Sequence, residues 1–266
     1  MAAPTRKPKW AIDKERRRRS EPDRVWLFGL HAVRDALQNQ ARDRHRLIVT
    51  PNAERKLADA IEAAGMTPEV ADPRRFTAPL DPQSVHQGAA LEVDPLDWGD
   101  LTSLCKPYPK DPAPIAVALD RVTDPHNVGA ILRSAEVFGA RAVIAPQHHS
   151  APETGALAKT ASGALERQPY LRLRNLADAL EHLAGLGYRL IGLDGTAEAT
   201  LDDAIAAARP GPICLVLGAE GPGLRMKTRE TCHQLARIDS TGAFGSLNVS
   251  NAAAVSLYAA RAGYTT

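Results

Sequence analysis

The sequence has few cysteines and no long apolar run, and each absence excludes a class of protein. Its three cysteines, Cys105, Cys214 and Cys232, are widely spaced and include no Cys-x-x-Cys pair. They therefore predict neither a disulfide framework nor a metal site, and they favour a reducing cytoplasm. No apolar run approaches the roughly 20 residues that span a bilayer, and no apolar signal region stands near the N-terminus. We expect a cytoplasmic protein without a membrane span.

The net charge of +2 is small, but it is unevenly distributed. Residues 1–24 carry nine Lys or Arg and four Asp or Glu, so this segment is +5 and the remaining chain is −3. A concentrated basic arm attracts a polyanion through counterion release. Trp10 within the arm favours RNA, because an indole can stack on a base, and DNA is not expected. A disordered, merely solvated tail is the alternative.

Two α/β regions follow the arm, and their patterns differ. Residues 25–94 alternate short strands and helices, as in a compact α/β unit. Residues 95–113 lose this periodicity and are rich in proline, which predicts a stiff linker. Residues 114–266 alternate apolar strands with amphipathic helices, which predicts a parallel sheet covered by helices on both faces. Ligands of such sheets bind beyond the carboxyl ends of the strands, so three loops there are candidates for a site.

The hydrophobic periodicity also predicts the bounds of the individual elements. In the first region we expect strands at 25–28, 45–50 and 86–93, and helices at 29–39 and 53–65. In the second we expect strands at 115–122, 140–146, 188–195, 213–218 and 235–239, and helices at 127–138, 175–187, 201–208 and 249–262.

The first candidate loop opens a helix that carries an arginine among apolar residues. Asn127 is placed to cap this helix. Arg133 needs a partner or a cleft on so apolar a helix. It can pair with Glu136 at i,i+3, or it can contact an anion or hydroxyl in a site. His126 has no second ligand at metal-binding spacing, so we expect it to pack in the turn.

The second candidate loop, "LGAEGPGLR" at 217–225, follows the apolar run "ICLVL". Its glycines permit close backbone approach and positive φ. A phosphate-binding P-loop would have a lysine where Leu224 stands, and Glu220 puts a negative charge in the middle. A plain strand-to-helix turn is the alternative. This loop alone does not identify a ligand.

The third candidate loop leads into a helix rich in alanine and serine. Ser246, Leu247 and Asn248 stand at its start. Ser246 or Asn248 could act simply as the N-cap.

The three loops together are far more specific than any one alone. The segments "DPHNVGAILRSAEVFGA", "LVLGAEGPGL" and "GSLNVSNAAAVSLY", in this order, resemble the three motifs of SpoU/TrmH-type RNA 2′-O-ribose methyltransferases. "FGLHAVRDAL" and "HQGAALEV" resemble the start and end of the substrate-binding domain that precedes many such catalytic domains. The resemblance covers about residues 25–262, which leaves out only the arm and the last few residues.

This resemblance implies a fold, a cofactor and an assembly. The family has a C-terminal trefoil knot, which periodicity could not predict because knots are essentially absent from other folds. It binds S-adenosylmethionine in the knot and acts as a homodimer. The motif positions that imply cofactor contacts are Leu217, Gly218, Gly221, Ile238 and Leu247. The polar positions at the reacting centre are Asn127, Arg133, Glu220, Ser246 and Asn248.

One position departs from the family pattern. Where the family usually has Ile-Pro-Met at the start of the third motif, this chain has Ile238-Asp239-Ser240. This change bears on cofactor affinity rather than on the type of reaction.

The resemblance implies an S-adenosylmethionine-dependent enzyme that methylates a ribose 2′-hydroxyl of RNA. We expect a guanosine of large-subunit (23S) rRNA as the substrate, with tRNA second. A non-catalytic RNA-binding assembly factor on the same fold is the alternative from another class. A Rossmann or P-loop enzyme is a third, but the glycine spacing is not that of the Rossmann fingerprint, and Leu224 stands in place of the P-loop lysine.

Overall fold

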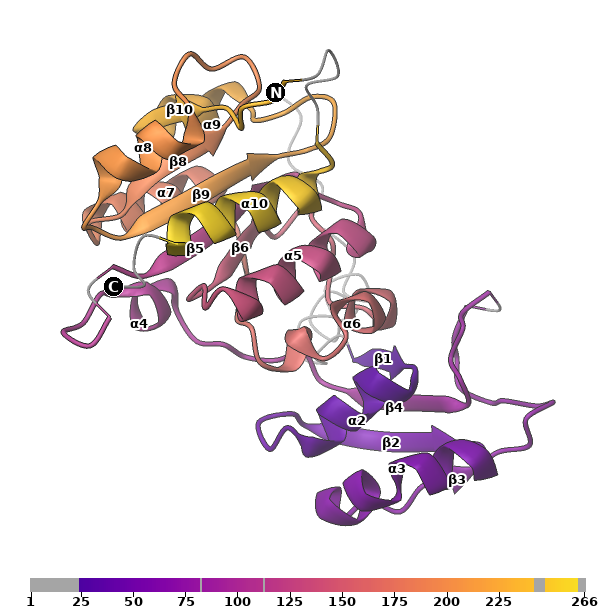
Figure 1. Cartoon of the computed structure of the whole chain (residues 1–266). Helices are drawn as coiled ribbons and strands as arrows, with labels where there is room; N and C mark the ends of the chain where they lie inside the picture. Colours follow the sequence, from indigo (N-terminus) through magenta and orange to yellow (C-terminus); the bar gives the residue numbers. More distant parts are fainter. Residues whose placement is uncertain (1–23, 82, 112, 242–246, 263–266) are drawn as a thin grey trace, which may run out of the picture. The chain divides into compact units, whose positions relative to one another are not determined.

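The computed structural model describes residues 24–81, 83–111, 113–241 and 247–262 (Figure 1). Nearly all of the basic arm and Ser246 lie outside these residues, so the predictions for them stay predictions. The chain divides into two compact units, residues 1–96 and 97–266. None of the helices in the described ranges is long and apolar enough to cross a membrane.

The described residues of the first unit form a four-stranded sheet with two helices. The strands have the order β1-β4-β2-β3, with β4 antiparallel to both of its neighbours and β3 parallel to β2. The helix α3 begins after the N-cap Thr50, whose side chain accepts a hydrogen bond from the Ala53 amide, and it ends at Gly65 with φ 62°. The elements are β1 (Val25–Phe28), α2 (Leu30–Gln38), β2 (Arg44–Val49), α3 (Pro51–Ala64), β3 (Glu69–Val70) and β4 (Ala89–Val93).

The second unit contains a six-stranded parallel sheet of order β10-β8-β9-β5-β6-β7. Its strands are β5 (Ile115–Asp120), β6 (Val143–Pro146), β7 (Tyr170–Leu173), β8 (Arg189–Leu193), β9 (Ile213–Gly218) and β10 (Gln234–Ala236). Its helices are α4 (Leu101–Cys105), α5 (Pro125–Val137), α6 (Gly155–Ala161), η1 (Ala164–Glu166), α7 (Leu176–Gly185), α8 (Leu201–Ala208), α9 (Met226–Thr231) and α10 (Val249–Ala262). A parallel sheet flanked by helices, preceded by a small α/β unit, is the predicted fold class.

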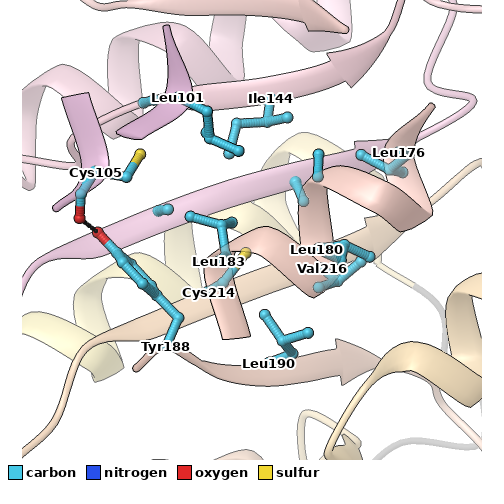
Figure 2. Close-up of a cluster of buried hydrophobic side chains, with 14 of the residues drawn as sticks. Leu101, Cys105, Ile144, Leu176, Leu180, Leu183, Tyr188, Leu190, Cys214 and Val216 are labelled. Carbon is cyan, nitrogen blue, oxygen red and sulfur yellow. Dashed lines mark hydrogen bonds between the residues drawn. The ribbon is translucent and has the colours of Figure 1, made fainter. Parts of the chain in front are cut away.

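Helices cover both faces of this sheet because its strands are almost wholly apolar. The helices α4 and α7 bury one face, and Figure 2 shows their side chains against those of the strands. On the other face α10 packs against β9 and β5 and also against α5 (Figure 1). Gly129 of α5 allows α6 to come close, because a Cβ there would lie 2.9 Å from the Ala161 amide nitrogen.

The segment that we expected to be a stiff linker contains the helix α4 and belongs to the core of the second unit. Leu101 and Cys105 are buried in the cluster of Figure 2. The Tyr188 hydroxyl donates to the Cys105 carbonyl oxygen at 2.8 Å, and the side chain of Asp100 caps α4. A helix of five residues is too short to produce a visible period, and the surrounding prolines obscured it.

Other differences concern short elements. The periodicity missed α6, β7 and α9, which are four to seven residues long. The strand expected at 86–93 begins only at Ala89, because Gln87 and Gly88 have φ values of 54° and 78° and cannot continue a strand.

Candidate active site at the carboxyl ends of the strands

The three predicted loops meet at one edge of the large sheet. The strands β5 and β9 are neighbours, and Asp120 pairs with Gly218 at their ends. The loops that follow these strands, at 121–124 and 219–225, therefore leave the sheet side by side. The third loop comes from the edge strand β10, yet it leads into α10, which packs on β9 and β5 in the centre.

Three polar side chains, one from each loop, form a closed group that we call the polar cluster. It consists of Asn127, Glu220 and Asn248. The Asn248 side-chain amide donates to Oε1 of Glu220 at 2.5 Å and to Oδ1 of Asn127 at 3.0 Å. The Asn127 amide donates to the same Glu220 oxygen at 3.4 Å. Residues 121 positions apart in the sequence are thus in direct contact.

The carboxylate of Glu220 lies among neutral donors. Besides the two asparagines, the backbone amide of Val249 donates to Oε1 at 3.3 Å. No lysine or arginine of the described residues forms an ion pair with it. The negative charge of Glu220 is therefore available to attract a cationic group of a ligand.

A cavity of about 590 Å³ lies beside the polar cluster. This volume is within the range of small-molecule sites. Its walls come from the ends of β8 and β9, the glycine loop and the third loop. They include Glu220 and all five residues expected to contact a cofactor: Leu217, Gly218, Gly221, Ile238 and Leu247.

The glycine loop folds back on itself next to this cavity. A Cβ on Gly218 would lie 2.2 Å from the carbonyl carbon of Gly223 and 2.4 Å from the amide nitrogen of Leu224. Both atoms are backbone and cannot move aside cheaply. The Gly223 amide donates to the Ala219 carbonyl at 2.9 Å, and the turn uses φ values of 83° at Gly221 and 68° at Gly223.

Two ion pairs that the sequence analysis missed hold the segment after the loop. Asp120 is fully buried and accepts from the backbone amide of Arg225 at 2.9 Å and from its Nε at 2.7 Å. Asp194 pairs with Arg229, and both line the cavity. The only sequence signal for Asp120 was a carboxylate at the end of the otherwise apolar run "IAVAL". A buried carboxylate needs a charged partner or several donors.

Arg133 stands apart from the polar cluster. Its side chain is exposed on α5 and forms no hydrogen bond or ion pair with any described residue. The alternative pairing with Glu136 is wrong, because Glu136 pairs instead with Arg167. Val137, one turn further along, is 76% exposed. The described part of the chain therefore leaves the face of α5 that carries Arg133 and Val137 exposed to solvent.

The cap of α5 also differs from the expected one. Asp124 is the N-cap and accepts from the His126 amide at 3.0 Å, while Asn127 lies inside the first turn and joins the polar cluster. An N-cap needs an extended backbone, and Asp124 before Pro125 has φ −73° and ψ 119°. The His126 ring lies 3.3 Å from the Thr160 hydroxyl.

The segment that departs from the family pattern also lines the cavity, through Ile238, Asp239 and Ser240. Asp239 is exposed and its carboxylate pairs with Nε of Arg237 at 3.1 Å. Arg237 in turn donates to the Ala197 carbonyl at 2.9 Å. The aspartate thus ties this turn to the loop before α8.

Comparison with known families identifies both units. Residues 114–258 match the model of the SpoU rRNA Methylase family. Residues 26–98 match the model for RNA 2′-O ribose methyltransferase substrate binding. The chain therefore belongs to the SpoU rRNA methylase family, as the three motifs indicated.

Relatives and solved structures agree with this assignment. A 23S rRNA (guanosine-2′-O-)-methyltransferase of Ralstonia nicotianae is 40% identical over 88% of this chain and 94% of its own. One of Vibrio vulnificus is 36% identical over 88% and 95%. The SpoU methyltransferase AviRb of Streptomyces viridochromogenes, solved in complex with AdoMet, has the same fold. It superposes with a TM-score of 0.76 over 94% of each chain, at 23% identity.

Proposed function

We propose that this protein transfers a methyl group from S-adenosylmethionine to the ribose 2′-hydroxyl of a guanosine in 23S rRNA. The observation that carries the proposal is the polar cluster, in which one residue from each motif loop meets at a cavity of about 590 Å³. Two relatives that are 36% and 40% identical are 23S rRNA (guanosine-2′-O-)-methyltransferases by name, and each matches 88% of this chain.

The cavity suits this cofactor in shape and charge. Its glycine loop exposes backbone groups and has no phosphate-binding lysine. Leu217, Ile238 and Leu247 provide apolar contact, and Glu220 provides a negative charge that forms no ion pair with a lysine or arginine of the described residues. A bound S-adenosylmethionine would supply the electrophilic methyl group at its positively charged sulfur. We propose that these residues and the backbone of Gly218 and Gly221 hold it.

The chain's own residues then position the hydroxyl that is methylated. We assign Asn127, Glu220, Asn248 and Ser246 to the surroundings of the reacting ribose. Arg133 would orient the 2′-hydroxyl and its adjoining phosphate, because a guanidinium binds phosphate with two parallel hydrogen bonds. Arginine does not lose its proton in proteins, so it does not act as the base.

The division of labour between the units follows the same proposal. Residues 25–94 would select the RNA, and the arm at 1–24 would add affinity. The second unit, which includes α4, would carry out the transfer in the cytoplasm. Transfer RNA is the second candidate substrate, and an assembly factor without activity is the alternative of a different class. The intact polar cluster argues against the latter.

The test is methyl transfer from labelled S-adenosylmethionine to three RNAs: 23S rRNA, 16S rRNA and tRNA, each prepared without modification. We expect label only in 23S rRNA, at the 2′-oxygen of one guanosine, as read by mapping of the product. Transfer to tRNA alone would favour the second candidate. Binding of 23S rRNA without transfer, although S-adenosylmethionine binds, would favour the assembly factor.

We further propose that the C-terminal chain forms a trefoil knot. After the edge strand β10 the chain returns to the centre, where Asn248 joins the polar cluster and α10 packs on β9 and β5. The third loop lines the same cavity as the glycine loop. This return of the chain to the centre of the sheet, beside the glycine loop, supports the proposal that the C-terminal segment passes through a preceding loop.

The same unit would form a homodimer through α5 and α10. Val137 and Tyr258 are 76% and 64% exposed, and Phe138 stacks edge-on against Tyr258 with ring centroids 6.1 Å apart. Apolar side chains exposed together favour a protein partner. Sedimentation should show a dimer at micromolar concentration, and Val137→Glu should shift it toward monomer. A wild-type protein that is monomeric and active would contradict the proposal.

A further inference from the structure

A second group of residues occupies the same edge of the large sheet, on the side away from the cavity. The register pairs Asp120 with Gly218, Ala118 with Ile144, and Pro146 with Leu173. The first residues beyond β5, β6 and β7 are therefore level with one another.

Basic side chains stand at these positions after β5 and β7, and two histidines follow one and two residues later in the loop after β6. They are Arg121 after β5, His148 and His149 after β6, and Arg174 after β7, and we call them the basic edge. Adjacent strands are about 4.8 Å apart, and β5 and β7 are separated only by β6. The basic edge therefore extends roughly 10 Å from β5 to β7.

The arginine side chains of the basic edge have no partners among the described residues. Arg121 and Arg174 are exposed and form no hydrogen bond or ion pair with any described residue. Around the cavity, in contrast, Arg225, Arg229 and Arg237 each pair with an aspartate. The basic edge therefore keeps its guanidinium donors available for an anion.

The backbone at the basic edge is held in a costly conformation. Arg121 has φ 64° and His149 has φ 61°, in the left-handed region that favours glycine. Residues other than glycine persist there when the surroundings impose it, often at functional sites. The next loop is fixed by Arg172, whose Nη2 donates to the Gln147 carbonyl at 2.5 Å and whose Nε donates to the Ser150 hydroxyl at 3.3 Å.

The two carboxylates that follow Arg121 and Arg174 most closely in the sequence are each engaged at the start of a helix, and a third, Glu153, lies in the loop after β6. Asp124 accepts from the His126 amide at 3.0 Å, and Asp178 accepts from the Asn175 side chain at 2.7 Å. Neither forms an ion pair with Arg121 or Arg174 within the described residues. They do not neutralise the basic edge directly.

We propose that the basic edge binds backbone phosphates of the substrate RNA, on the strand that continues from the methylated nucleotide. The inference rests on the proposed function and adds the path of the RNA to it. Phosphate contacts fix position and carry little sequence information, so this edge would set affinity and alignment while other residues choose the nucleotide.

The first test compares Arg121→Ala/Arg174→Ala with Lys110→Ala in the full chain. Lys110 is an exposed cation in the turn before β5, at the opposite, amino-terminal edge of the sheet. The double variant should bind 23S rRNA fragments on the order of 10- to 100-fold more weakly. Its log–log salt slope should fall by about 1.4, which is about 0.7 for each lost contact on a single strand. Affinity for S-adenosylmethionine and the methylated nucleotide should not change.

The second test uses the backbone conformation. Arg121→Gly removes the charge at a position where glycine is unstrained, so RNA binding should weaken while the unfolding midpoint does not fall. If the wild type methylates RNA, and the double variant Arg121→Ala/Arg174→Ala has the same RNA affinity and salt slope as Lys110→Ala, the inference is overturned. A wild type that neither binds S-adenosylmethionine nor methylates RNA would instead overturn the proposed function.

Discussion

Two regions of the second unit differ in whether their charged side chains have partners within the described residues: the cavity side, and the outward side, which consists of Arg133 on α5 and the basic edge. Around the cavity, Asp120, Asp194 and Asp239 each pair with an arginine, and the polar cluster closes through its own hydrogen bonds. On the outward side, Arg133 and the arginines of the basic edge have no partner in the described residues. The described residues therefore satisfy one another's charges around the cavity and leave guanidinium groups unpaired on the outward side.

The difference follows from the two proposed ligands. A small cofactor binds in a largely preformed cavity, so its walls must be fixed before it arrives. An RNA strand meets exposed guanidinium groups that can still move, and it supplies the anions that they lack. A second copy of the chain would in addition cover the apolar residues near Arg133.

The strongest test of the outward side is Arg133→Ala. Loss of one positioned donor at a reacting centre costs on the order of 100-fold or more in rate. Because the Arg133 side chain is exposed and forms no hydrogen bond or ion pair with the described residues, folding and S-adenosylmethionine affinity should be unchanged. Single-turnover methyl transfer and calorimetry measure the two quantities separately.

The matched variant is Arg133→Lys, which keeps the charge but loses the planar pair of donors. It should remain slow if the geometry of the guanidinium matters. Wild-type turnover in Arg133→Ala would remove this residue from the proposed site.

On the cavity side, the strongest test is Gly218→Ala. The new Cβ would lie within 2.2–2.5 Å of backbone atoms of Gly223 and Leu224, so the loop must shift. Overpacking of this kind typically costs about 1–3 kcal/mol, which corresponds to roughly 10- to 100-fold in S-adenosylmethionine affinity if the loop supplies it.

Gly221→Ala is the control within the same loop. Gly221 has φ 83°, but no heavy atom lies within 4 Å of a Cβ placed there. Backbone strain alone should therefore cost less than the collision at Gly218. Equal affinities of the two variants would show that close packing at Gly218 does not shape the cavity.

The sequence predicted what strong patterns encode. The long strands β5 and β9 and the helix α10 were found because apolar runs and periodicity mark them clearly. The joint position of Asn127, Glu220 and Asn248 came from the family resemblance, and the structure brings all three together. Periodicity by itself could not have joined residues so distant in sequence.

What the sequence did not reveal depends on tertiary contacts. Asp120 pairs with Arg225 across 105 positions, and no local pattern connects them. The helix α4 forms because Leu101 and Cys105 can be buried against the sheet, which is a property of the folded unit. Asp124, and not Asn127, is the N-cap of α5, because the backbone of Asp124 is extended while Asn127 lies within the helix.

The smallest effect that we predict concerns pH and the cavity side. His233, just before β10, accepts a hydrogen bond at Nδ1 from the Leu190 amide at 3.0 Å, which requires a neutral ring. Burial and then the nearby Arg189 lower the pKa of His233 below its usual value. The folded state therefore binds this proton less readily than the unfolded state. Its contribution to stability is complete above pH of about 6.5 and is lost as the pH falls toward the folded pKa. Because the ring is largely exposed, solvent screens the effect, and we expect the free energy of unfolding to change by less than about 1 kcal/mol.

Urea unfolding between pH 8 and 5 should show this decrease in the wild type and not in His233→Asn, which keeps an acceptor but does not titrate. Parallel curves for the two proteins would mean that the strands beside the cavity are not held by the neutral histidine.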